Sequence, residues 1–175
     1  RRRICGSIGH NNEEVKMANT FNHVGIGVGN IQRAVNFYRD AFGCRLLGEV
    51  FEVTSDGPNG EEAVDVLSSR PFRSMQMANL VTIDGIGLEI FQLIDPPYET
   101  RIPALEYWKS GTFHICMTAP DFDATLQKIL DLGGKQISQS WQRDPNDESK
   151  RMVYCTDPWG TVIELYTHSF VDTYK

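Results

Sequence analysis

The sequence predicts an α+β fold made of two tandem βαβββ modules, and three observations lead to this prediction. Alternation of apolar and polar residues, typical of a half-buried strand, begins each half of the chain, at residues 21–28 and 112–118. An amphipathic helical segment follows each of these strands directly. Three further strand-like runs follow each helical segment. Each half of the chain therefore has the order strand, helix and three strands.

A constant spacing indicates that the two halves are related by duplication. His114 lies 91 residues after His23, and Gly134 lies 91 residues after Gly43. Self-similarity at a fixed offset is the signature of a repeated supersecondary unit. The first strand and the end of the first helix therefore recur at equivalent positions in the second half.

The repeat places the modules at residues 20–95 and 111–169. One module of this size buries too little apolar surface to fold alone, so we expect a single domain over residues 17–175. The first module carries an insertion around residues 55–70. Residues 1–16 are polar and basic without hydrophobic periodicity, and we interpret them as a disordered leader or as residues left from expression.

The helices have clear start and stop signals. Asn30 is a favourable N-cap for a helix at Ile31–Phe42, and Gly43 is a favourable residue to end it. Asp121 is the equivalent N-cap for a second helix that runs to Leu132. The strands expected after the two helices are residues 45–53, 75–82, 86–94, 135–140, 151–156 and 161–167. The charged stretch 141–150 is loop-like, and we interpret it as a solvated hairpin connection or as a lid over a cavity.

Composition excludes several classes of function. The net charge of −6 and the pI near 5.2 provide no basic surface for nucleic acid or for an anionic membrane. The apolar runs are single strands, far shorter than the roughly 20 residues that cross a bilayer. The four cysteines form no CxxC pair, which favours reduced thiols and a cytoplasmic location.

Strand parity brings four ionisable side chains to equivalent places. His23 and His114 lie in the first strand of each half, and Glu89 and Glu164 lie in the last, on the face opposite the apolar stripe. A carboxylate in the middle of an apolar strand is costly unless it is paired or bound to metal. Two imidazoles and two carboxylates suit one divalent ion of Zn, Ni, Co, Mn or Fe.

Three further side chains share that face with the four candidate ligands. Phe91, Cys116 and Tyr166 are candidate contacts for a small-molecule substrate. Ordinary packing explains the two aromatic residues equally well. Cys116, two residues after His114, is either a fifth ligand or a small buried hydrophobe.

Four segments resemble the vicinal oxygen chelate superfamily, which includes glyoxalase I, bleomycin-resistance proteins and extradiol dioxygenases. They are HVGIGVGNIQRAVNFYRDAFGCRLLG, GLEIFQL, GTFHICMTAPDFDATLQKILDLGG and MVYCTDPWGTVIELYTH. The resemblance implies a half-open β-barrel with a metal in its cavity, and a homodimer. The metal positions of glyoxalase I fall on His23, Glu89, His114 and Glu164, so its metal set is the closest. Glyoxalase I also has an arginine that holds glutathione, and the position here is Gly27.

These expectations favour a metal-dependent lyase or isomerase of the glyoxalase type. Such an enzyme removes a proton next to a carbonyl of a small oxygenated metabolite, and the metal stabilises the charge that develops. Glu164 and Glu89 are the candidate catalytic acid and base. The alternatives are a non-enzymatic binding or resistance protein and an iron-dependent dioxygenase.

Overall fold

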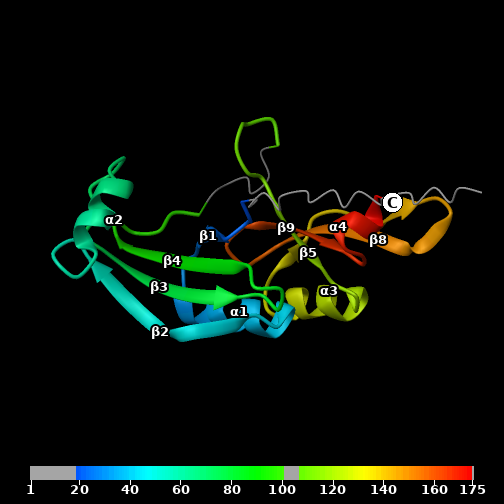
Figure 1. Ribbon diagram of the computed structural model, residues 1–175, viewed down its shortest axis with the longest axis horizontal. Coiled ribbons are helices and arrows are strands. Elements are labelled where there is room, and N and C mark those ends of the chain that lie inside the picture. Colours follow the sequence, from blue (N-terminus) through cyan, green and yellow to red (C-terminus); the bar gives the residue numbers. More distant parts are fainter. Residues whose placement is uncertain (1–18, 101–106, 175) are drawn as a thin grey trace, which may run out of the picture.

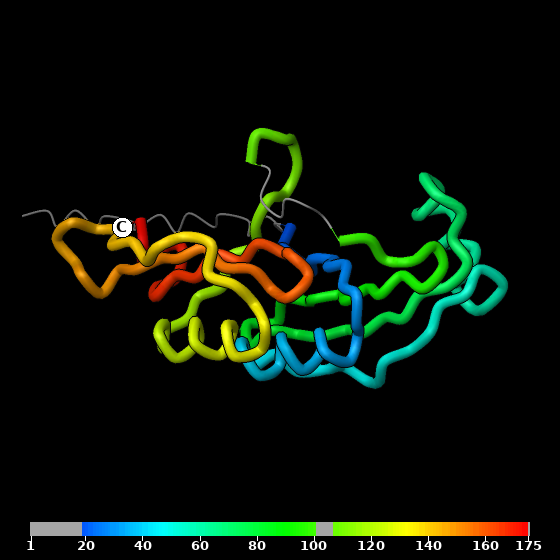
Figure 2. The backbone as a smooth tube through the Cα atoms, turned by 180° about the vertical axis from the view of Figure 1, so that it is seen from behind, coloured from blue at the N-terminus to red at the C-terminus, as the bar shows by residue number. Residues whose placement is uncertain are grey.

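The computed structural model of the chain describes residues 19–100 and 107–174. The leader expected at residues 1–16 lies outside these ranges. Figure 1 shows two sheets side by side, with one long helix beneath each, and Figure 2 shows the same arrangement from behind. The α+β fold with two βαβββ-like modules is therefore confirmed.

The first module forms a four-stranded mixed sheet with the order β1-β4-β3-β2. Its first and last strands pair in parallel, and the other neighbours pair antiparallel. A short helix, α2, lies in the insertion between β2 and β3. The elements are β1 (His23–Gly27), α1 (Ile31–Phe42), β2 (Arg45–Thr54), α2 (Gly60–Val66), β3 (Ser74–Val81) and β4 (Gly87–Asp95).

The second module repeats this topology with the order β5-β9-β8-β6, and β7 pairs with β8 outside that path. Again the first and last strands pair in parallel. A short helix, α4, ends the described chain. The elements are β5 (Ile115–Thr118), α3 (Phe122–Asp131), β6 (Lys135–Gln136), β7 (Trp141–Asp144), β8 (Asp147–Thr156), β9 (Val162–Tyr166) and α4 (Phe170–Thr173).

Residues 141–150 form the exposed hairpin that the sequence indicated, but its arms are strands rather than loop. Trp141 pairs with Met152 and Gln142 with Arg151, so this stretch forms a hairpin of β7 and the first half of β8. Both faces of β7 are largely exposed, which removes the apolar alternation by which a strand is recognised. The strand expected at residues 135–140 is shorter in the structure, where it spans Lys135–Gln136.

Residues at its two ends determine where helix α1 begins and ends, and its bounds are those predicted from the sequence. The Asn30 side chain accepts a hydrogen bond of 2.8 Å from the backbone N–H of Arg33, which caps the first turn. Gly43 takes the left-handed conformation, with φ of 70°, and its N–H donates to the Arg39 carbonyl at 2.8 Å. Both ends of the helix are therefore determined by residues next to them in the chain.

The apolar faces of the two sheets are buried against α1 and α3, which also contact each other. Leu88 and Ile90 of β4 and Ile163 and Leu165 of β9 are each at most 3% exposed, as strand parity predicted. The opposite faces of both sheets are therefore the ones that carry Glu89 and Glu164.

In the part of the chain that the structure describes, no helix has the length and hydropathy to cross a membrane.

A buried carboxylate joins the two modules. The Tyr38 hydroxyl of α1 donates to Asp157 Oδ2 at 2.9 Å, across from the first module to the second. Asp157 Oδ1 accepts from the backbone N–H groups of Trp159 and Thr161, at 2.9 and 2.8 Å. Burial raises the pKa values of both Tyr38 and Asp157. The residues 157–161 thus form a turn whose conformation depends on one fully enclosed side chain.

Candidate metal centre

The first module positions one histidine beside one glutamate on its exposed sheet face. His23 Nε2 lies 3.3 Å from Glu89 Oε2. In the β1–β4 ladder His23 pairs with Gly87 and Gly25 pairs with Glu89, so the two side chains are diagonal neighbours. A Cβ at Gly87 would lie 2.8 Å from the Cβ of His23, so glycine provides the room that the histidine needs. We call His23 and Glu89 the first half-site.

A neighbouring amide is placed to orient the first histidine. His23 Nδ1 lies 2.7 Å from the side-chain oxygen of Asn22, within hydrogen-bonding distance. In the tautomer that carries its hydrogen on Nδ1, this nitrogen donates to Asn22, and Nε2, on the side of Glu89, is left to bind a metal ion. The geometry is the one expected of a metal-binding imidazole held by an outer partner.

We expect Asn22→Ala to weaken metal binding by about tenfold, because the outer hydrogen bond that orients His23 is lost. Titration calorimetry with Mn²⁺ measures the change. Asn22→Asp is the matched control, since its carboxylate still accepts from Nδ1. Unchanged affinity in the alanine variant, together with unchanged ¹⁵N shifts of the His23 ring, would contradict this role for Asn22.

The second module carries the equivalent pair in the equivalent register. His114 Nε2 lies 3.2 Å from Glu164 Oε2. Cys116, two residues after the histidine, pairs with Glu164, just as Gly25 pairs with Glu89 in the first module. We call His114 and Glu164 the second half-site. The duplication seen in the sequence is therefore retained in the geometry of the two half-sites.

The second half-site is the more enclosed of the two. Glu164 is only 7% exposed, and among the described residues His114 Nδ1 is a buried atom without a hydrogen-bond partner. Burial, together with the neighbouring Glu164 carboxylate, raises the pKa values of Cys116 and Tyr154 to about 12 each. Both groups are therefore protonated at neutral pH and able to donate to Glu164. Protonation also makes Cys116 a neutral thiol rather than a reactive thiolate.

Both half-sites have the donor spacing that a shared metal ion requires. Two ligand atoms about 2.1 Å from one ion, at bond angles of 90–109°, are separated by about 3.0–3.4 Å. The observed nitrogen–oxygen separations of 3.3 and 3.2 Å fall in this range. Imidazole with carboxylate is also a suitable donor set for the divalent ions expected from the sequence. Each half-site therefore fits two adjacent positions of a metal coordination shell.

Within one chain the structure does not bring the two half-sites together. Among the described residues, no three or more His, Cys, Asp or Glu side chains are close enough to hold a metal ion. The pairing of His23 with Glu89 and of His114 with Glu164 is observed. The joining of all four into one centre remains a prediction.

The second half-site opens into a cavity of about 660 Å³, which we call the second-module cavity. Of the three predicted substrate contacts, Tyr166 lines this cavity, Phe91 packs beside an apolar cluster of the first module, and Cys116 does not line it. Cys116 is an exposed residue, so its interpretation as a small buried hydrophobe was wrong. Several other residues that line the second-module cavity were not predicted from the sequence. Trp141 and Arg143 alternate along one strand, a period-two signal that their exposed hairpin obscured. The lining residues are His114, Trp141, Gln142, Arg143, Met152, Tyr154, Glu164, Tyr166, Phe170 and Tyr174.

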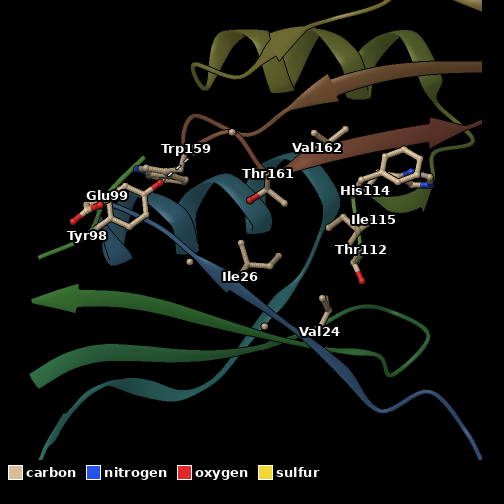
Figure 3. A pocket seen from close by; sticks show the side chains of 14 residues that line it. Val24, Ile26, Tyr98, Glu99, Thr112, His114, Ile115, Trp159, Thr161 and Val162 are labelled. Atoms are coloured by element: carbon tan, nitrogen blue, oxygen red, sulfur yellow. Dashed lines mark hydrogen bonds between the residues drawn. The ribbon is translucent and has the colours of Figure 1, made fainter. Parts of the chain in front are cut away.

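A different cavity, of about 410 Å³, lies between the modules and is lined by β1 and by the residues around β5 and β9. Figure 3 shows His114 at one end of it and Trp159 with Tyr98 at the other. Gly27 lines this cavity, and a Cβ at Gly27 would have no neighbour within 4 Å. The position at which glyoxalase I has its glutathione-binding arginine is thus an open space.

Two βαβββ modules, each with a His–Glu pair in the same register, define a protein of the glyoxalase-like fold. Comparison with protein families agrees with this class. Residues 20–165 match the model described as "Glyoxalase/Bleomycin resistance protein/Dioxygenase superfamily". The chain belongs to this superfamily, which is also the vicinal oxygen chelate superfamily that the sequence resembles.

Solved structures from three organisms share the fold. A glyoxalase family protein from Bacillus cereus has a TM-score of 0.67 and 22% identity, over 88% of this chain and 96% of that one. A mutant of the fosfomycin resistance protein FosX from Listeria monocytogenes, complexed with Mn(II) and 1S,2S-dihydroxypropylphosphonic acid, has a TM-score of 0.56 and 12% identity, over 91% of this chain and 100% of that one. A mutant of glyoxalase I from Zea mays has a TM-score of 0.56 and 18% identity, over 85% of this chain and 45% of that one. At these identities the similarity establishes the fold and not the reaction.

Proposed function

We propose that this protein is a divalent-metal-dependent lyase or isomerase that removes a proton next to a carbonyl of a small oxygenated metabolite. The observation that supports this function most is the repetition of one His–Glu pair, at 3.3 and 3.2 Å, in both modules. A single such pair is an ordinary ion pair. Two pairs in the same register, each with the donor spacing of a metal shell, favour a common ligand role.

We further propose that two copies of the chain complete each metal centre. The half-sites are separate in one chain, and a twofold axis would place the first half-site of one copy against the second half-site of the other. Such a homodimer has two identical centres of two histidines and two glutamates. An octahedral ion bound in this way keeps two positions for two neighbouring substrate oxygens.

The glutamates supply the acid and base chemistry of this proposal. A bound divalent ion would stabilise the negative charge that develops on a substrate oxygen. Glu164 takes the carbon-bound proton, and its low exposure of 7% keeps water from competing for that proton. Glu89, on the other side of the centre, enters the turnover as the carboxylic acid and donates its own proton to the product. Proton exchange with solvent then returns both glutamates to their starting states. His23 and His114 would hold the metal ion together with the two glutamates.

Mixing two inactive variants tests both the metal and its assembly. One variant carries His23→Ala with Glu89→Gln, and the other carries His114→Ala with Glu164→Gln. Neither homodimer has a complete centre, but a mixed dimer has one centre that is intact if the half-sites combine between chains. After refolding an equimolar mixture, we expect Mn²⁺ binding to recover to about a quarter of the wild-type level.

Metal stoichiometry from calorimetry and mass from light scattering give the readouts for this mixture. If each centre instead forms within one chain, mixing the two variants restores no Mn²⁺ binding. That result would contradict assembly of the centre between copies. A wild-type protein that binds none of Mn²⁺, Zn²⁺, Ni²⁺, Co²⁺ or Fe²⁺ would overturn the metal enzyme and support the non-enzymatic binding protein. Selective binding of oxygen-sensitive Fe²⁺ would support the dioxygenase instead.

A further inference from the structure

One cationic side chain lies in the second-module cavity beside the second half-site. Arg143, from β7, is the one lysine or arginine among the described residues that line this cavity. His114 and Glu164 line the same cavity, so a molecule that occupies it contacts both the half-site and the guanidinium. The β7–β8 hairpin thus contributes a charge to the space where a substrate would lie.

The Arg143 guanidinium has no carboxylate partner in the part of the chain that the structure describes. Its recorded contact is with Tyr174, whose hydroxyl oxygen lies 3.5 Å from Nη2 and whose ring centroid lies 5.9 Å from Cζ. By contrast, Arg151 forms two hydrogen bonds of 2.9 Å with Asp123. Glu164 is the carboxylate whose charge reaches Arg143, but the two form no ion pair in the described part of the chain. A guanidinium that faces a cavity and forms no ion pair there is able to bind an oxyanion of a ligand.

Aromatic side chains line the same cavity as Arg143 and the second half-site. The hydroxyls of Tyr166 and Tyr174 lie 3.4 Å apart, and the rings of Phe170 and Tyr174 lie 4.9 Å apart. Helix α4 supplies Phe170, and Tyr174 follows it. The Ser169 side chain caps this helix by accepting from the backbone N–H of Asp172 at 3.2 Å. These rings give the cavity apolar surface beside its metal-binding and cationic groups.

We infer that Arg143 binds the anionic group of the substrate and so sets the substrate class of this site. The inference rests on the proposed function, because the half-site is taken to hold the two neighbouring oxygens of the same molecule. The substrate is then an elongated acid: two adjacent oxygens at one end, a short apolar middle, and a carboxylate or a phosphonate at the other. Uncharged ketones and aldehydes lack the group that Arg143 recognises.

Matched probes test this inference on the full-length protein loaded with Mn²⁺. 2-Oxoglutarate and 2-oxopentanoate have the same chain length and the same oxo-acid end, but only 2-oxoglutarate has a distal carboxylate. We expect calorimetry to show that the wild type binds 2-oxoglutarate about tenfold more tightly, and that Arg143→Gln removes this preference without changing Mn²⁺ affinity. 2-Oxo-4-phosphonobutanoate, compared in the same titration, identifies whether a carboxylate or a phosphonate is the better anion.

Two control variants separate a specific contact from a general charge effect. Arg45→Gln removes an exposed arginine of β2, outside the cavity, and should retain the full preference. Arg143→Lys keeps the positive charge but loses the planar guanidinium, and it should retain part of the preference for 2-oxoglutarate. Equal binding of the two probes by a wild type that binds Mn²⁺ would overturn the inference and leave the proposed function standing. A wild type that binds no Mn²⁺ overturns the proposed function. The inference about Arg143 is then tested on metal-free protein. It is supported if the wild type prefers 2-oxoglutarate and Arg143→Gln removes that preference.

Discussion

Replacing Glu164 by Gln is expected to weaken metal binding by about 100-fold or more and, at the same time, to stabilise the metal-free protein by about 1 kcal/mol. Glu164 is 7% exposed and faces His114 at 3.2 Å. Without a metal, the carboxylate charge is mostly buried, and its hydrogen-bond partners Cys116 and Tyr154 are neutral groups. A neutral amide of the same shape can accept from the same partners without the cost of burying a charge. With a metal, the amide is a poorer ligand. Residues selected for binding commonly reduce stability in this way.

Chemical denaturation with and without Mn²⁺ measures both effects on the same samples. Glu49→Gln, an exposed substitution on β2, is the matched control and should change neither quantity. A purely structural ion pair between Glu164 and His114 predicts the reverse result. In that case Glu164→Gln would destabilise the metal-free protein, and Mn²⁺ would make no difference to either variant.

Replacing Asp157 by Ala is expected to lower the free energy of unfolding by about 3–5 kcal/mol, the largest loss from any single polar substitution considered. Three donors lose their acceptor at once: the Tyr38 hydroxyl and the backbone N–H groups of Trp159 and Thr161. Asp157 is 2% exposed, so water cannot replace the carboxylate without opening the contact between the modules. The turn that precedes β9, and hence the position of Glu164, depends on this network.

Urea denaturation followed by circular dichroism measures this loss. Tyr38→Phe removes only one of the three donors and should cost about 1–2 kcal/mol. Asp56→Ala, an exposed aspartate in the first-module insertion, is the control and should stay within about 0.5 kcal/mol of the wild type. An Asp157→Ala protein as stable as the Asp56→Ala control would show that the buried network does not hold the modules together.

Much of the secondary structure follows from residues close together in the sequence. Helix α1 has the bounds Ile31–Phe42 that its cap residues and apolar period indicated. The face on which each candidate ligand lies also follows from local rules, because the side chains of a strand alternate. Parity therefore predicted that His23, Glu89, His114 and Glu164 lie on the sheet faces away from the helices. The structure added that they lie in two His–Glu pairs. The assignment to one superfamily is a consequence of the same repeated pattern.

The stretch at residues 141–150 marks a limit of sequence reasoning. A strand is recognised by a buried face, and β7 is stabilised by pairing with β8 while most of its side chains remain exposed. The composition of this stretch predicted a solvated hairpin connection without strands. Pairing of β7 with β8 makes it a strand hairpin, which places Arg143 and Trp141 in the lining of the second-module cavity.

The sequence by itself determined the two modules, the helices and the four candidate ligands, because each depends on a period, a cap or a repeat in the chain. The pairing of the ligands two by two came from the β1–β4 and β5–β9 ladders of the structure. Only the tertiary structure decided how the modules lie against each other. Packing of α1 against α3 and the contact of Tyr38 with Asp157 keep the two half-sites apart in one chain. Such contacts join residues far apart in sequence, and their geometry depends on the shapes of whole packed faces, which no local period encodes.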